Sequence, residues 1–281
     1  YTKDSSVNIY GLDGDVSSQN IIRSAAEIDN AGNIQNIDKY NGKKVISALY
    51  AEGSDASIVL NGDLNSVQTY ADSSDYEHTL ERTVWAYDGA DITINGGVNI
   101  STDRYDDTVD RNNSDDIAIV AGTAADLKED DVFTTNNTQV FVNYNGSSNF
   151  IEGDLISAYD GNLVIKPLEE MGTQTYAASR ANTTNLINIK GNAIAGNGGK
   201  LSIDLGNGGS WIGRADDYQD AGGSNDEFSE QHVNFFNPAF SSNIVHNGEV
   251  NLTMGEGSLW DVTGQSWITK IDGSGGEINL I

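Results

Sequence analysis

The sequence contains no cysteine, which excludes disulfide bonds, thiolate metal ligands and cysteine nucleophiles. Basic residues are scarce, because 15 Lys and Arg face 42 Asp and Glu, and the net charge at pH 7 is −27. A surface of this sign repels the phosphates of nucleic acids and the headgroups of anionic lipids, so no nucleic acid partner is expected. No apolar run approaches the roughly 20 residues that cross a bilayer. We therefore expect no direct membrane insertion, and any targeting signal or anchor would lie outside these 281 residues.

Motifs that carry catalysis are also missing. Three His residues occur, all in polar stretches without a nucleophile turn of the Gly-x-Ser-x-Gly type: His78, His232 and His246. The sequence has no His-Glu-x-x-His motif, phosphate loop or dinucleotide fingerprint. The pairs Asp106-Asp107 and Asp115-Asp116 could serve a glycosidase or a lyase, but such pairs arise by chance among 42 acidic residues. We predict that the chain is not an enzyme, with a polysaccharide-active lyase or glycosidase as the alternative.

The sequence does contain an internal repeat of short β-type segments. An apolar run, a turn and a second apolar run recur in the same order at 45–62, 83–96, 117–142 and 155–165. Four alanines mark equivalent positions with steps of 35, 35 and 37 residues: Ala51, Ala86, Ala121 and Ala158. Periods of this length are typical of solenoids, propellers and arrays.

The pattern within the repeat favours a solenoid. Segments such as 200–205, 250–254 and 277–280 alternate apolar with polar residues, and they lie near Gly or Asn. Alternation turns one face of each strand inward, and stacking successive coils about 4.8 Å apart buries those faces. A propeller would need blades of four longer antiparallel strands, and a β-sandwich would need fewer and longer apolar runs. We predict an all-β chain with a single domain, residues 1–281, folded as a parallel β-helix (solenoid) with projecting loops.

This prediction specifies which side chains form the core. The residues expected to point inward are Ile58, Leu60, Ile92, Ile94, Val140, Val142, Val164, Leu201, Ile203, Leu205, Val250 and Leu252. Helical periodicity is almost absent. The single plausible helix spans residues 21–28, where Ile21, Ile22, Ala25 and Ile28 would share one face.

The C-terminal end resembles a known family. The run Trp260-Asp261-Val262-Thr263-Gly264-Gln265-Ser266, which follows the glycine-rich residues 255–257, is similar to a coil near the end of pertactin-type autotransporter passengers. The resemblance implies a right-handed β-helix that is exported through a C-terminal outer-membrane barrel and displayed extracellularly on a Gram-negative cell. That barrel is absent from the 281 residues. Many such passengers are adhesins that bind host molecules or copies of themselves, in virulence or biofilm formation, and others are proteases or esterases.

Binding residues are expected where segments interrupt the coils, because loops on a rigid scaffold vary freely. Two polar insertions stand out, 101–116 and 215–231. Their candidate interaction residues are Tyr105, Asp106, Asp107, Arg111, Asp115, Asp116, Asp216, Asp217, Tyr218, Asp220 and Phe228. A lateral face is the alternative, because stacking aligns Asn, Ser and Thr into ladders, as residues 136–138 and 182–185 suggest. The expected partner is a host glycoprotein or glycan, or an identical molecule on a neighbouring cell.

No cofactor is predicted, and calcium is the alternative. A hard cation takes several oxygen ligands, which acidic loops supply. Asp126, Glu129, Asp130 and Asp131 form one acidic cluster. They lack the spacing of an EF-hand and the repeated nonapeptide of calcium-binding β-rolls, so the sequence carries no calcium motif.

Overall fold

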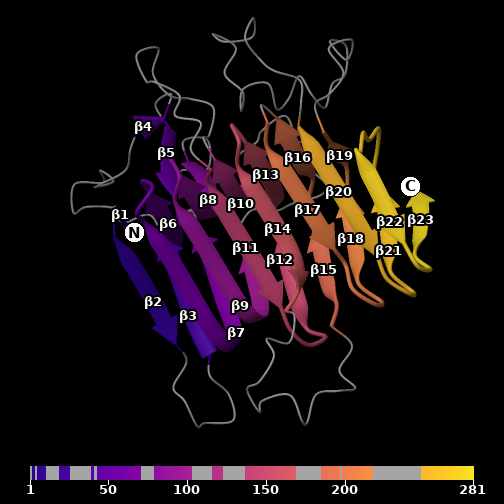
Figure 1. The fold of residues 1–281 in the computed structure, drawn as a ribbon, viewed down its shortest axis with the longest axis horizontal. Coiled ribbons are helices and arrows are strands. Elements are labelled where there is room, and N and C mark those ends of the chain that lie inside the picture. The colour runs from indigo at the N-terminus through magenta and orange to yellow at the C-terminus, as the bar shows by residue number, and fades with distance from the viewer. Residues whose placement is uncertain are drawn as a thin grey trace, which may run out of the picture.

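The computed structural model describes residues 2–3, 5–10, 19–25, 39–40, 43–70, 79–102, 116–122, 137–168, 185–196, 198–217 and 248–281. Within these ranges the chain is all-β and its sheets are almost entirely parallel (Figure 1). The same residues contain no helix that could cross a membrane. The fold class predicted from alternation is therefore confirmed at the level of an all-β chain with parallel sheets.

The smaller sheet has nine strands in the described residues. Its neighbours are, in order, β1 (Thr2–Lys3), β6 (Leu49–Glu52), β8 (Thr79–Tyr87), β10 (Asp116–Gly122), β13 (Asp154–Ala158), β16 (Ala193–Gly196) and β19 (Ala215–Asp216). Two more strands join it: β5 (Lys43–Ile46) pairs with β8, and β4 (Lys39–Tyr40) pairs with β5. The β4–β5 pair is antiparallel, and the other pairs in this sheet are parallel.

The larger sheet has fourteen strands in the described residues and curls, because two long strands, β7 (Ser57–Tyr70) and β9 (Asp91–Ser101), each belong to two arms. The first arm adds β2 (Ser6–Tyr10), β11 (Gln139–Tyr144), β14 (Asn162–Pro167), β17 (Lys200–Asp204), β20 (Glu249–Met254) and β22 (Lys270–Gly273). The second arm adds β3 (Gln19–Ala25), β12 (Asn149–Glu152), β15 (Ile187–Lys190), β18 (Ser210–Gly213), β21 (Leu259–Val262) and β23 (Glu277–Leu280). In Figure 1 the first-arm strands from β9 to β22 lie side by side in chain order.

Strand pairing confirms most of the repeat. Ala51 pairs with Ala86, and Ala86 pairs with Ala121, so both predicted steps of 35 residues are correct. The last marker is wrong by one residue, because Ala121 pairs with Ser157 and Ala158 pairs with Gly122. The register between β10 and β13 shifts between Ile117 and Ile119. The two strands therefore pair one residue away from the position that the sequence repeat predicted.

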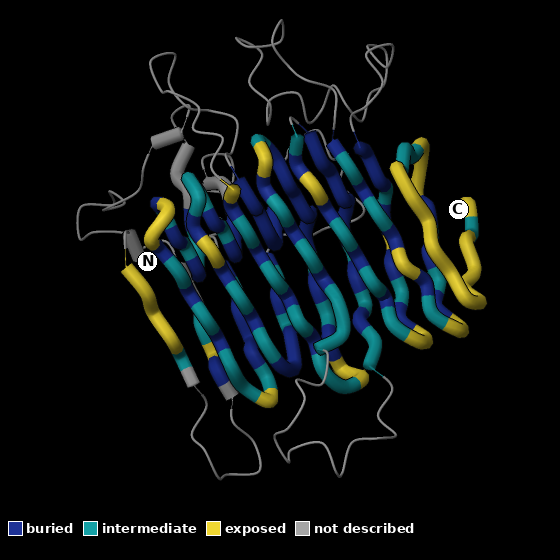
Figure 2. The backbone as a smooth tube through the Cα atoms, in the orientation of Figure 1, coloured by how far each residue is buried: buried dark blue, intermediate teal, exposed yellow. Residues whose placement is uncertain are grey.

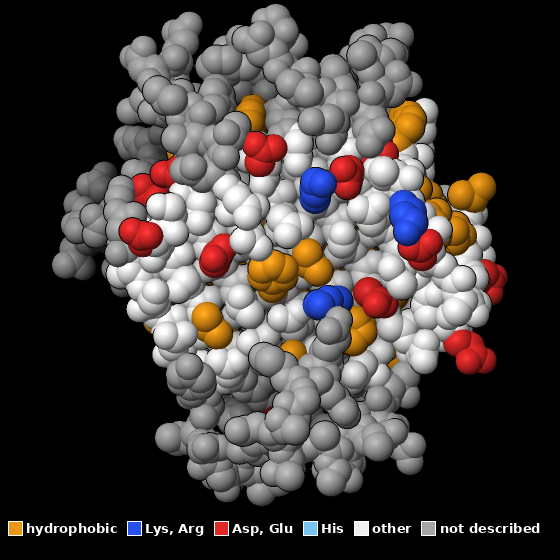
Figure 3. All heavy atoms as spheres, in the orientation of Figure 1, with side chains coloured by type: hydrophobic (Ala, Val, Ile, Leu, Met, Phe, Trp, Pro, Cys, Tyr) orange, Lys and Arg blue, Asp and Glu red, His pale blue; other side chains and the backbone are white. Residues whose placement is uncertain are grey.

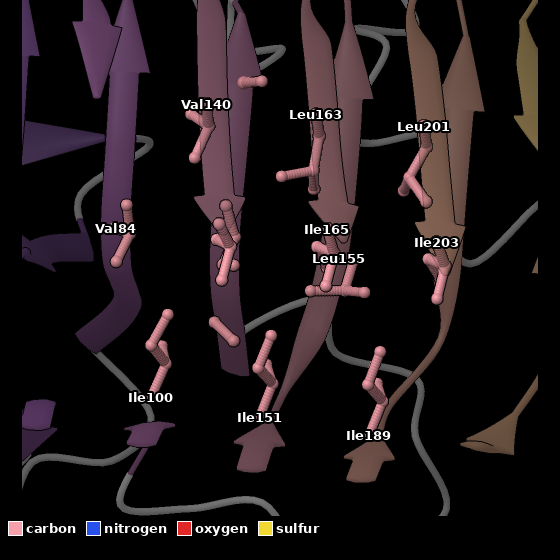
Figure 4. Close-up of a cluster of buried hydrophobic side chains, with 14 of the residues drawn as sticks. Val84, Ile100, Val140, Ile151, Leu155, Leu163, Ile165, Ile189, Leu201 and Ile203 are labelled. Atoms are coloured by element: carbon pink, nitrogen blue, oxygen red, sulfur yellow. The ribbon is translucent and has the colours of Figure 1, made fainter. Parts of the chain in front are cut away.

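The core lies between the sheets, where the inward rows of successive strands pack on one another (Figures 2 and 4). Eleven of the twelve residues predicted to point inward are buried. Val164 is the exception and is half-exposed. Alternation along β14 instead turns its two neighbours, Leu163 and Ile165, into the core, where both are fully buried.

The predicted helix at residues 21–28 is wrong in its described part. Residues 21–25 belong to strand β3, which pairs in parallel with the second half of β7. Ile22 packs on the core beside its partner Val67, whereas Ile21 points away and is 58% exposed. A strand separates adjacent side chains onto opposite faces, and the backbone of β7 supplies the hydrogen bonds that a helix would have made internally. Residues 26–28 lie outside the described ranges.

Buried polar and aromatic groups fix the curl of the larger sheet. Asn65 lies within β7, where its Nδ2 donates to the carbonyl oxygens of Asn95 and Gly97 at 3.0 and 3.1 Å. Its Oδ1 accepts a 2.8 Å hydrogen bond from Nδ2 of Asn20 in β3. In the second arm the indoles of Trp211 and Trp260 stack with ring centroids 4.6 Å apart and nearly parallel planes. These side chains satisfy backbone groups and fill volume where successive layers turn.

Candidate functional site

The structure describes three of the eleven candidate interaction residues. Asp116 opens β10 and pairs with Glu81. Asp216 ends β19 and is 3% exposed, and the buried Asp217 accepts a 2.8 Å hydrogen bond on Oδ2 from the Thr269 hydroxyl. Burial leaves Asp216 and Asp217 little surface for a partner. The other eight lie outside the described residues: Tyr105, Asp106, Asp107, Arg111, Asp115, Tyr218, Asp220 and Phe228.

A broad lateral face covers the first arm. We define it as the outward side chains of β7, β9, β11, β14, β17, β20 and β22 in that arm. One of its rows is a ladder of asparagines, in which Nδ2 of Asn95 donates to Oδ1 of Asn61 and Nδ2 of Asn143 donates to Oδ1 of Asn95, both at 2.8 Å. Strand alternation and parallel register place these three amides in line.

Of the predicted ladder segments, 136–138 and 182–185, only residues 137, 138 and 185 are described. Thr138 is buried, and its hydroxyl accepts a 2.8 Å hydrogen bond from the backbone N–H of Gly89. Asn185 likewise accepts one from the N–H of Gly146. The Asn61–Asn95–Asn143 ladder was missed, although Asn61-Gly62 and Asn95-Gly96 repeat after the same apolar run and would have revealed it.

The middle row of the lateral face is mixed. Thr93, Phe141, Val164 and Ser202 are register neighbours in successive strands, so two adjacent apolar side chains lie between hydroxyl groups. Lys200 and Glu249 form an exposed ion pair at 3.3 Å on the outer row. Figure 3 shows this side of the molecule, where the described surface is largely uncharged with isolated charges and small apolar areas.

Charge on the lateral face nearly cancels. It carries three lysines, which are Lys166, Lys200 and Lys270, and four acids, which are Asp91, Asp204, Glu249 and Asp272, a net charge of −1. The whole chain carries −27. The excess negative charge therefore lies elsewhere, so two copies that meet through this face bring nearly neutral surfaces together.

A groove of about 720 Å³ opens at the edge of this face, where β14, β17, β20 and β22 end. Its lining combines polar side chains with three glycines and two apolar residues: Pro167, Asn185, Asp204, Gly206, Asn207, Thr253, Met254, Gly255, Asp272, Gly273 and Ser274. Beneath it, the Tyr144 hydroxyl donates to the carbonyl oxygen of Asp204 at 2.9 Å. Burial and the negative charge of Asp204 raise the pKa of Tyr144, so its phenol stays neutral.

The groove offers carboxylates without the other parts of an acid–base site. Asp204 and Asp272 line it, and the described lining contains no Lys, Arg, His or aromatic side chain. Asp272 is already ion-paired with Lys270, and Asp204 has no cation beside it in that lining that would stabilise developing negative charge. Across the described ranges, no three His, Asp or Glu side chains gather as a metal site would require. The acidic cluster at 126–131, for which calcium was considered, lies outside those ranges.

Two surfaces of the described chain thus remain as functional candidates, the lateral face and the groove at its edge. The asparagine ladder and the low net charge distinguish the first, and the polar lining distinguishes the second. Their roles have to be argued from this chain alone, because no protein-family model, no curated protein and no solved structure matches it.

Proposed function

We propose that the chain is a right-handed parallel β-helix of the autotransporter-passenger type and acts as an extracellular adhesin on a bacterial surface. Parallel strands that return in register, twice after 35 residues, and a sheet that curls through β7 and β9 support the solenoid. The similarity of residues 260–266 to a passenger coil supports the family. On this proposal the molecule adheres by association with a copy of itself on a neighbouring cell.

The observation that carries the proposal is the lateral face. Its rows of Asn, Ser and Thr can donate and accept hydrogen bonds along many strands, and Phe141 with Val164 supplies apolar area. Each contact is weak, but contacts repeated along a rigid scaffold, and between many molecules on two cells, add through multivalency. A net charge of −1 on this face lets two copies approach although each carries −27.

The alternative of a polysaccharide-active enzyme has less support. Glycosidases and lyases need an acid and a base placed on either side of one bond, usually with a cation or aromatic side chains that hold the sugar. The described groove supplies two carboxylates, of which Asp272 is already ion-paired with Lys270, and its lining has no aromatic side chain. We therefore propose that the groove binds a ligand and does not cleave a bond in it.

Surface display tests the proposal. Non-adherent bacteria displaying the chain are expected to settle from suspension, and Phe141→Asp is expected to abolish settling because it places a charge in the middle of the lateral face. Phe150→Asp is the matched control, since Phe150 is also half-exposed but projects from β12 in the second arm. Retention of settling by Phe141→Asp, with equal display and unchanged circular dichroism, would refute self-association through this face.

A further inference from the structure

Three side chains of the groove each have one polar atom held by the backbone. Oδ1 of Asn207 accepts from the N–H of Glu256 at 3.0 Å, and Oδ1 of Asn185 accepts from the N–H of Gly146 at 2.9 Å. Oδ1 of Asp204 accepts from the N–H of Gly206 at 2.9 Å. These bonds fix the orientation of all three side chains before any ligand arrives, which lowers the entropy that binding must overcome.

The same bonds determine what each side chain still offers. Because a backbone N–H can only donate, the amide oxygen of each asparagine is the bonded atom, and its Nδ2 group remains to donate. Oδ2 of Asp204 remains to accept. Among the described residues none of these three atoms has a hydrogen-bond partner. Asp204 ends β17 and Asn207 lies in the turn that follows, so a free acceptor and a free donor lie near each other in the chain.

A sugar hydroxyl suits this combination, because it donates one hydrogen bond and accepts others. Pro167 adds apolar surface on which the C–H face of a sugar ring can pack, whereas Met254 is buried in the core beneath the groove. The ligand should carry no negative charge, since Lys270 offsets only Asp272, and Asp204 has no basic residue beside it in the described lining. A sulfated or uronic acid glycan would bring like charges together.

We propose that this groove is a binding site for a neutral glycan, in which Asp204 accepts a hydrogen bond from one hydroxyl and Asn207 and Asn185 donate to neighbouring oxygens. The site goes beyond self-association through the lateral face. It gives the molecule a second recognition mode, for glycans on a foreign surface. Affinity for a single site should be modest, because the groove is open and lacks an aromatic platform, and many displayed copies would compensate by avidity.

The test exchanges donors and acceptors without removing the bonds that shape the turn. Asp204→Asn keeps an oxygen for the Gly206 N–H but converts the free acceptor into a donor, and Asn207→Asp keeps an oxygen for the Glu256 N–H but converts the free donor into an acceptor. Asp261→Asn is the matched control for charge. It lies in β21 of the second arm, where its Oδ1 accepts a hydrogen bond from Asn279, and it does not line the groove.

The probes are neutral tetrasaccharides of β-linked glucose, mannose, galactose and N-acetylglucosamine, each titrated into the 281-residue chain and followed by NMR and calorimetry. At least one is expected to bind saturably with a Kd of about 1 mM. Asp204→Asn and Asn207→Asp should each weaken that binding by about tenfold or more, because a donor then faces a donor or an acceptor faces an acceptor. Asp261→Asn should leave it unchanged, and a chelator should have no effect.

Several results would overturn the site. One is that no neutral tetrasaccharide saturates the chain up to about 20 mM. Another is that sulfated or uronic acid glycans bind equally well. A third is that both exchange variants keep the wild-type affinity. Loss of binding on chelation would assign recognition to a bridging cation and not to direct hydrogen bonds. Phe141→Asp separates this inference from the proposed function, since it should stop cell settling and leave glycan affinity intact.

Discussion

Truncation of two adjacent residues in β14 tests the register on which the core and the lateral face both depend. Ile165 is fully buried and pairs with Val142 and Ile203, whereas Val164 is half-exposed between Phe141 and Ser202. Ile165→Ala should lower the free energy of unfolding by about 2–5 kcal/mol, the usual cost of removing a large aliphatic side chain from a core. Val164→Ala removes two methyl groups that are only partly buried, so about 1 kcal/mol or less is expected.

Equilibrium urea unfolding, followed by circular dichroism, measures both costs. Since a stacked array can lose cooperativity, hydrogen exchange of the β11, β14 and β17 amides provides a local readout. Ile165→Ala should speed exchange in these strands, and Val164→Ala should leave it close to wild type. A Val164→Ala cost equal to or larger than that of Ile165→Ala would show that the register of β14 is shifted by one residue and that Val164 belongs to the core.

Other contacts lead to further predictions. Asn65→Ala should cost about 1–3 kcal/mol in urea unfolding, because the carbonyl oxygens of Asn95 and Gly97 lose their buried donor. Trp260→Ala should cost about 3–5 kcal/mol, because it removes one buried ring of the stack, and it should change the fluorescence of Trp211. The raised pKa of Tyr144 stabilises the fold fully below the unfolded pKa of about 10 and loses that contribution as pH rises further, so Tyr144→Phe should show a smaller loss of stability between about pH 9 and 11.

Alternation predicted most of the core because it reports directly which residues share a face. It failed at Val164, because Leu163-Val164-Ile165 is a continuous apolar run that does not show which of its side chains point inward. The flanking polar residues contain the missing signal, because Asn162 and Lys166 must point outward and thereby place Val164 outward with them. The helix expected at 21–28 failed for another reason. Its local periodicity was compatible with a helix, but pairing with β7 decided the outcome.

The candidate site was less predictable than the fold. The groove is lined by residues from 167 to 274, so their proximity depends on stacking of strands that are far apart in sequence. Which atoms remain free depends on backbone N–H groups of the turns, and no residue pattern encodes these. The asparagine ladder was more accessible, since it follows from combining the repeat period with the position of Asn after an apolar run.

Salt distinguishes the kinds of contact that could join two copies. Each chain carries −27, and at about 0.01 M ionic strength this charge acts over a Debye length of roughly 30 Å, which shrinks to roughly 8 Å at 0.15 M. Cells that display the chain should therefore settle faster at about 0.15 M than at 0.01 M sodium chloride. Because the lateral face itself is nearly neutral, a further increase in salt should neither break the contact nor strengthen it much. Phe150→Asp should follow the wild-type dependence, while Phe141→Asp should settle slowly at every salt concentration. If settling instead weakened steadily with salt, the contact would have to consist of opposite charges, and the neutral lateral face could not be the adhesive surface.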